Sequence, residues 1–174
     1  TRNADFREQI TFPNVERTMN RRRRRLLPKV PKCAQEFVDL LKDAPRFNKY
    51  FLREVFVDNE VEAVLFGHPK LLSAMEKARE TMADGTFGVC PTQFAQLFLV
   101  SFKHKNQKNC FPGLSVLMTG KSEEKYVKVM EALKDIIPGF DPHFLMADFE
   151  KAIHNSFSKV FKNCRTKGCR FHYG

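Results

Sequence analysis

The stretch Thr81-Met82-Ala83-Asp84-Gly85-Thr86-Phe87 decides the fold of this 174-residue chain. It sets a single carboxylate, Asp84, inside a strand-like run. On its own, the Asp-Gly pair is typical of a hairpin turn, because glycine tolerates φ > 0 and aspartate bonds its own backbone. Asp148 follows a second apolar run in Phe144-Leu145-Met146-Ala147-Asp148-Phe149-Glu150, and a cysteine and a histidine come later in Gly168-Cys169-Arg170-Phe171-His172. The order of the elements around these stretches decides whether they form one site.

The pattern from residue 80 onward predicts alternating strands and helices. Strand-like runs over 81–89, 93–102 and 110–118 are joined by short connections, which favours antiparallel neighbours. Ser122 is a good helix N-cap, and Pro138-Gly139 stops that helix. We then expect a strand over 144–147, a helix capped by Asp148, and a last strand over 165–173.

The predicted order is therefore β-β-β-α-β-α-β, an α/β (α+β) fold with a mixed sheet flanked by helices. This is the order of a ribonuclease H-like fold. In such a fold, acidic residues on the first and fourth strands meet at neighbouring sheet positions and hold divalent metals.

Residues 33–79 read as a small αβ appendage packed before the main sheet. A short helix is expected over 33–43. A hairpin is expected between 54–57 and 60–65, around Asp58-Asn59, and a further helix from Pro69, which suits a first helical position. Nothing in this segment suggests chemistry.

The positive charge of the chain is gathered in patches. The net charge is +10, and residues 1–32 hold 10 of the 30 Lys and Arg residues against 3 of the 20 acids. Five arginines follow one another and are flanked by prolines, so we expect residues 1–32 to be an extended basic linker or tail. Such a run contacts nucleic-acid phosphate or a nuclear-import receptor; its members are Arg21, Arg22, Arg23, Arg24 and Arg25.

Composition narrows the class of protein. Apolar residues make up 43% of the chain, with 18 phenylalanines and no tryptophan, which indicates a packed core. No apolar run approaches the ~20 residues of a membrane helix, so a membrane partner is not expected. Five cysteines without a disulfide framework fit a reduced, intracellular protein.

Four motifs in order resemble one family. Asp84-Gly85-Thr86-Phe87, the segment from Leu117 to Tyr126, Met146-Ala147-Asp148-Phe149-Glu150, and Gly168-Cys169-Arg170-Phe171-His172 together resemble the transposase domain of Mutator-like elements, over roughly residues 80–174. The resemblance implies a nuclear protein with a DDE-type transposase core that performs metal-dependent DNA strand cleavage and transfer. DNA is the implied partner; further copies of the chain and an import receptor stay open as partners.

The resemblance also implies roles for particular residues. Asp84 and Asp148 would be the first and second metal-binding, catalytic carboxylates, holding Mg²⁺ (or Mn²⁺), whose octahedral shell hard oxygens and substrate phosphate complete. Cys169 and His172 match a signature whose role is structural. The third acid of the family, a glutamate, lies beyond that signature, and Glu150 is expected to face elsewhere. We therefore expect a truncated or degenerate copy, or a fragment of a longer protein, that does not cut DNA by itself.

Each of these assignments has a structural or non-catalytic alternative. Asp148 can be a helix cap and still reach a metal. Cys164, Cys169 and His172 supply three zinc ligands, with His143 or His154 needed for the fourth, so zinc is disfavoured. No neighbouring base supports a nucleophilic cysteine. The competing function is a domesticated, non-catalytic DNA- or protein-binding module, similar to a transcription factor.

Overall fold

A computed structural model describes residues 12–44, 48–105, 107 and 109–169. The chain divides into two compact units, residues 1–31 and 32–174. The described residues hold five helices, which are α2 (Phe12–Leu26), α3 (Ala34–Asp43), α4 (Pro69–Met75), α5 (Glu123–Ile136) and α6 (Lys151–Val160). The strands are β1 (Phe51–Val57), β2 (Glu60–Phe66), β3 (Glu80–Thr86), β4 (Gln96–Lys103), β5 (Cys110–Met118), β6 (Phe144–Ala147) and β7 (Arg165–Gly168).

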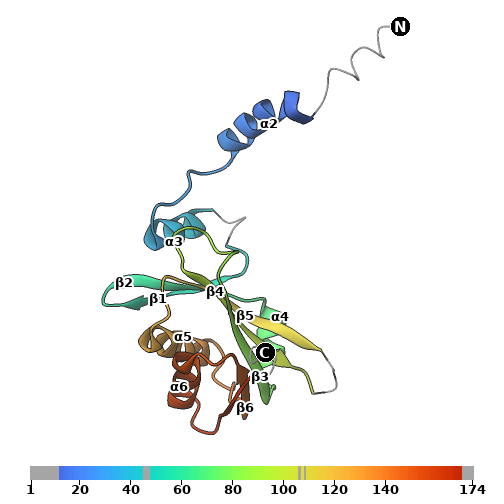
Figure 1. Cartoon of the computed structure of the whole chain (residues 1–174), viewed down its shortest axis with the longest axis vertical. Coiled ribbons are helices and arrows are strands. Elements are labelled where there is room, and N and C mark those ends of the chain that lie inside the picture. The colour runs from blue at the N-terminus through green and yellow to red at the C-terminus, as the bar shows by residue number, and fades with distance from the viewer. Residues whose placement is uncertain (1–11, 45–47, 106, 108, 170–174) are drawn as a thin grey trace. The chain divides into compact units, whose positions relative to one another are not determined.

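The strands form one mixed sheet in the order β1-β2-β5-β4-β3-β6-β7. Strands β3, β4 and β5 pair antiparallel, whereas β6 pairs parallel to β3 and β7 parallel to β6. This confirms the predicted mixed α/β class and the predicted order of elements from residue 80 onward. Helices α5 and α6 make the two crossovers and lie side by side (Figure 1).

The predicted hairpin exists, but it is not part of a separate layer. Asp58 and Asn59 have φ angles of 51° and 66°, which is the backbone of a type I′ turn. β2 then pairs antiparallel with β5, in register from Ala63 opposite Met118 to Phe66 opposite Ser115. The segment that we assigned to an appendage thus supplies two strands of the main sheet, because the second hairpin strand finds a free edge on β5.

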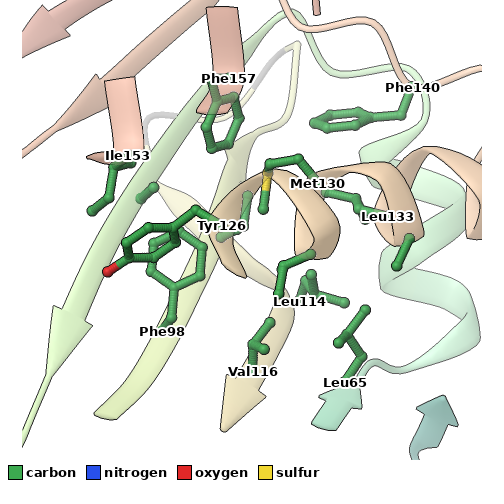
Figure 2. Packing of buried hydrophobic residues seen from close by; sticks show 14 of the residues in the cluster. Leu65, Phe98, Leu114, Val116, Tyr126, Met130, Leu133, Phe140, Ile153 and Phe157 are labelled. Carbon is green, nitrogen blue, oxygen red and sulfur yellow. The ribbon is translucent and has the colours of Figure 1, made fainter. Parts of the chain in front are cut away.

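The main core lies between the sheet and the helices α4, α5 and α6. Figure 2 shows Tyr126 of α5 with its ring against Phe98 of β4, at a centroid distance of 5.0 Å. Leu65, Leu114 and Val116 of the sheet are fully buried beneath Met130 and Leu133, which lie on the same stripe of α5 as Tyr126. A stripe at this spacing is typical of an amphipathic helix that packs on a sheet.

The opposite face of the sheet is covered unevenly. Helix α3 packs Val38 and Leu41 against Val64 and Leu117 in a second cluster over β2 and β5. Over the parallel strands β3 and β6, Met82, Phe144 and Met146 remain 37%, 42% and 43% exposed. These three side chains line a hollow of about 470 Å³.

The arginine run is helical, which corrects the expectation of an extended segment. Helix α2 contains all five arginines, and its side chains from Glu16 to Leu26 are exposed. Arginine is a strong helix former, and the rotation of about 100° per residue spreads adjacent guanidinium groups around the axis. Pro13 lies in the first turn and Pro28 beyond the end, where neither interrupts the helix.

Candidate active site at the carboxyl ends of β3 and β6

The two aspartates lie at neighbouring positions of the sheet. Ala83 of β3 and Ala147 of β6 are partners in a parallel pair, and Asp84 and Asp148 each follow one residue later. Because the strands are parallel, both residues reach the same edge of the sheet although the whole β4–β5–α5 segment separates them in sequence. The register brings together the two carboxylates that we expected to form one site.

Asp84 is a strand residue and not a turn residue. It lies within β3, opposite Leu99 of the antiparallel strand β4. Side chains alternate along β3, so Ala83 is buried in the main core and Asp84 is exposed on the opposite face. In the described part of the chain its carboxylate makes no ion pair.

Asp148 is held by its own loop. One of its carboxylate oxygens, Oδ1, accepts a hydrogen bond from the backbone N–H of Glu150 at 3.2 Å. Its carbonyl oxygen lies 2.7 Å from Nε2 of His154, at a distance where that nitrogen donates. The side chain is half-buried. These contacts hold the loop, and Oδ2 of Asp148 makes no hydrogen bond with the described residues.

The N-cap of α6 is Glu150, which corrects the expectation that Asp148 caps this helix. Phe149 and Glu150 intervene between β6 and the first helical residue, Lys151. Aspartate readily bonds the backbone two residues ahead, and this local turn competes with the capping position. Asp148 therefore lies in a turn at the end of the strand, one residue after the Ala83–Ala147 pair.

A buried hydrogen bond lies just inside this edge, and sequence reasoning missed it. Nε2 of Gln96 donates to the hydroxyl oxygen of Tyr126 at 2.7 Å, and both residues are 0% exposed. Burial raises the pKa of Tyr126 well above its usual range, and the nearby carboxylates of Glu150 and Asp148 add to the increase against the effect of Gln96. The one signal in the sequence was a glutamine directly before the apolar run 97–100.

Gly85 is required by this buried pair. A Cβ built on Gly85 would lie 2.7 Å from Oε1 of Gln96. That oxygen is itself buried, with no hydrogen-bond partner among the described residues. In this Asp-Gly pair the carboxylate of Asp84 therefore points to solvent. Gly85 lets the strand pack closely against Gln96, and it does not form a turn.

The Cys-x-x-His element is described only in part. The backbone N–H of Cys169 donates to the Ala147 carbonyl oxygen, which extends the β6–β7 pairing toward the site. His172 lies outside the described residues. Burial raises the pKa of the Cys164 thiol to about 11, and Asp141 contributes further. Such a thiol is not a ready nucleophile.

The described part of the chain contains no larger cluster of metal-ligating side chains. No three or more His, Cys, Asp or Glu side chains of these residues are grouped to hold a metal ion. His143 lies beside Arg79, and His154 is engaged by the Asp148 carbonyl oxygen. Among the described residues, neither histidine therefore joins Cys164 or Cys169 in a group that could hold zinc.

Part of the basic surface of α2 lies on one side of that helix. A hollow on α2 is lined by residues spaced three and four apart, which are Glu16, Arg17, Asn20, Arg21, Arg24 and Arg25. Residues at this spacing lie on one helical face. Among the described helices of both units, none combines the length and hydrophobicity that crossing a membrane requires.

Comparison with known proteins assigns the part of the chain that carries these aspartates. A search of curated proteins found no match. The family model of the MULE transposase domain matches residues 81–173, from the second residue of β3 to beyond β7. This match spans more than half of the 174 residues and includes both aspartates and the Cys-x-x-His element. The chain therefore belongs to the MULE transposase domain family.

Proposed function

We propose that this chain is a transposon-derived, nuclear DNA-binding protein whose core holds a divalent metal between Asp84 and Asp148. The observation that carries the proposal is the parallel register of Ala83 with Ala147, which sets both carboxylates at one edge. The order of β3, β4, β5, α5, β6, α6 and β7 supports a ribonuclease H-like arrangement. Binding of DNA is expected because the family is a transposase domain.

The donor set fits magnesium or manganese. Both groups are hard carboxylate oxygens, and Mg²⁺ is commonly held by one or two carboxylates, with water and substrate phosphate completing the shell. A bound metal of this kind activates an attacking oxygen and stabilises the leaving oxygen in phosphoryl transfer. Two protein carboxylates leave most ligand positions to water, so we expect this chain by itself to bind metal and DNA without cutting the strand.

The chain's own residues orient the site. The hydrogen bond from the Glu150 N–H and the contact between His154 and the Asp148 carbonyl oxygen hold the loop at the end of β6. Gly85, the residue after Asp84, lets the strand lie close to the side chain of Gln96. These contacts present one carboxylate from a strand and one from a restrained turn.

A metal titration tests the proposal. We expect Mg²⁺ to shift the NMR signals of Asp84 and Asp148, and Mn²⁺ to broaden signals around the end of β3 and β6. Asp84→Asn and Asp148→Asn should each weaken the effect, and Asp58→Asn in the β1–β2 turn should leave it unchanged. If Mg²⁺ and Mn²⁺ leave the signals of both aspartates unaltered at millimolar concentration, the metal site is wrong.

A second candidate function is a domesticated DNA- or protein-binding module in which the core serves as scaffold. The exposed cationic side of α2 favours it. It predicts salt-dependent DNA binding that is lost when Arg21, Arg24 and Arg25 become glutamine but survives the double change Asp84→Asn and Asp148→Asn. A catalytic function predicts that the double change abolishes cleavage by an assembled, active protein while sparing DNA binding. An import receptor as the partner of α2 would show as binding that DNA does not compete for.

A further inference from the structure

An exposed aromatic ring stands beside the candidate active site. Phe87 follows Asp84 by three residues, just past the end of β3, and is 51% exposed. Its Cζ lies 3.8 Å from the position that a Cβ on Gly85 would occupy. The ring is therefore folded back along the end of β3, next to the residue that follows Asp84.

A lysine is held against this ring. Nζ of Lys121 lies 3.6 Å from the centroid of Phe87 and 3.9 Å from Oε2 of Glu150. Lys121 comes from the β5–α5 connection and Glu150 from the β6–α6 connection, so three connections meet at this edge of the sheet. The Lys121 side chain is still 42% exposed, so its ammonium group is positioned but not enclosed.

This geometry differs from the other cation–aromatic contact of the described residues. Nζ of Lys49 is 5.2 Å from the centroid of Tyr50, and both are adjacent in sequence. Phe87 and Lys121 are brought together by the fold, at the same edge as both aspartates. The pair combines a partly exposed ring with a fixed cation.

Those two groups match the two parts of a nucleotide. A base stacks on an aromatic ring, and a phosphate pairs with an ammonium group. Paired bases inside a duplex have both faces covered by their neighbours, so a ring of this kind engages a base that has left the stack.

We propose that Phe87 and Lys121 form a nucleotide-binding subsite that takes an unpaired nucleotide of DNA beside the metal-binding edge. The base stacks on Phe87, and the phosphate of the same or the next nucleotide pairs with Lys121. The inference rests on the proposed function, since DNA is the ligand expected at this edge. It adds that single-stranded or frayed DNA is preferred over a blunt duplex.

Binding to defined oligonucleotides tests the subsite. The full chain is titrated with single-stranded, forked and blunt duplex DNA, each carrying 2-aminopurine, and fluorescence anisotropy and base fluorescence are measured with Mg²⁺ present. Phe87→Leu should weaken binding of forked and single-stranded DNA by about five- to a hundredfold, as expected for the loss of one stacked base. Phe87→Tyr should restore it.

The lysine has its own readout and both variants have matched controls. Lys121→Gln should weaken binding and lower the slope of log affinity against log salt by about one. Val89→Ala, in the same connection and 67% exposed, and Lys128→Gln, on α5, should change affinity by less than about twofold. Thermal unfolding checks that each variant is folded.

The possible results separate the two claims. If Phe87→Leu and Lys121→Gln bind forked DNA as the parent does, the subsite is wrong and the proposed function stands. If they weaken blunt and forked DNA equally, Lys121 contacts duplex backbone and the stacking is wrong. If the parent chain binds none of the three DNA forms, both the proposed function and the subsite are overturned.

Discussion

The side-chain amide of Gln96 and the hydroxyl of Tyr126 form a 2.7 Å hydrogen bond between two residues with no exposed surface. This bond links β4 to α5 directly beneath the edge that carries Asp84. A buried donor or acceptor that loses its partner costs about 1–3 kcal/mol, which is more than the bond itself contributes. The pair is therefore a sensitive point of the core.

Removal of one partner should destabilise the protein more than removal of both. We expect Tyr126→Phe to lower the free energy of unfolding by about 1–3 kcal/mol, since Nε2 of Gln96 keeps only its 3.5 Å contact with Sδ of Met118, a weak acceptor. Adding Gln96→Met should recover part of this loss. Urea denaturation of the two single variants and the double variant measures the coupling; additive effects would contradict the interpretation.

Gly85 should not tolerate a methyl group. Gly85→Ala places Cβ against Oε1 of Gln96, and we expect it to cost about 1–3 kcal/mol, as overpacking does. Gly88→Ala is the matched control, because a Cβ there would meet nothing within 4 Å. Thermal unfolding of both variants compares them. Equal effects would show that the contact with Gln96 does not set the loss of stability.

The ion pair between α3 and β1 should give the stability a defined pH dependence. Burial acts to raise the pKa of Glu54, but the 2.5 Å contact with Nζ of Lys42 and the other hydrogen bond and charges outweigh it and hold the pKa below its usual value. A lowered folded-state pKa stabilises the fold above the unfolded value of about 4.5, and this contribution is lost as pH falls through the folded value.

Lys42→Met should therefore raise the pKa of Glu54 and flatten the fall in stability below about pH 4.5. NMR titration of the carboxyl carbon and urea midpoints measured from pH 3 to 6 provide the two readouts. Lys128→Met, which removes an exposed pair with Glu131 on α5, is the control and should leave Glu54 unchanged.

The hairpin should unfold together with the rest of the sheet. Leu65 of β2 is 0% exposed and lies in the same core cluster as α5 and α6. We expect Leu65→Ala to cost about 2–5 kcal/mol and to shift a single unfolding transition, seen alike by probes in β2 and α6. Two separate transitions would show that residues 33–79 form an independent unit.

Short-range chemistry explains what the sequence predicted well. Asp58-Asn59 marks its own turn, Pro69 opens α4, and Ser122 caps α5 by accepting from the Lys125 N–H. Each of these depends on one or two residues and their immediate neighbours. The order of elements from β3 to β7 along the chain and the antiparallel pairing of β3, β4 and β5 were also predictable, since short connections join these three strands.

Long-range pairing accounts for the rest. No local pattern in β2 indicates that its second edge pairs with β5, so the hairpin was assigned to an appendage. The N-cap of α6 is Glu150 and not Asp148, because the side chain of Asp148 bonds the Glu150 N–H in a turn that competes with helix capping. The contact of Gln96 with Tyr126 joins positions thirty residues apart. The proximity of Asp84 and Asp148 was predicted only through the order of the strands.

The parallel register of β3 and β6 has a consequence for how the molecule folds. The first three strands of the core can pair as neighbours along the chain, but Ala83 meets Ala147 only after β4, β5 and α5 have been laid down. Closing so large a loop is slow compared with hairpin formation. The two aspartates therefore remain apart through the early steps of folding and meet when the crossover strand docks. A nascent chain thus passes the early steps of its folding before Asp84 and Asp148 become neighbours, and their meeting reports that β6 has docked.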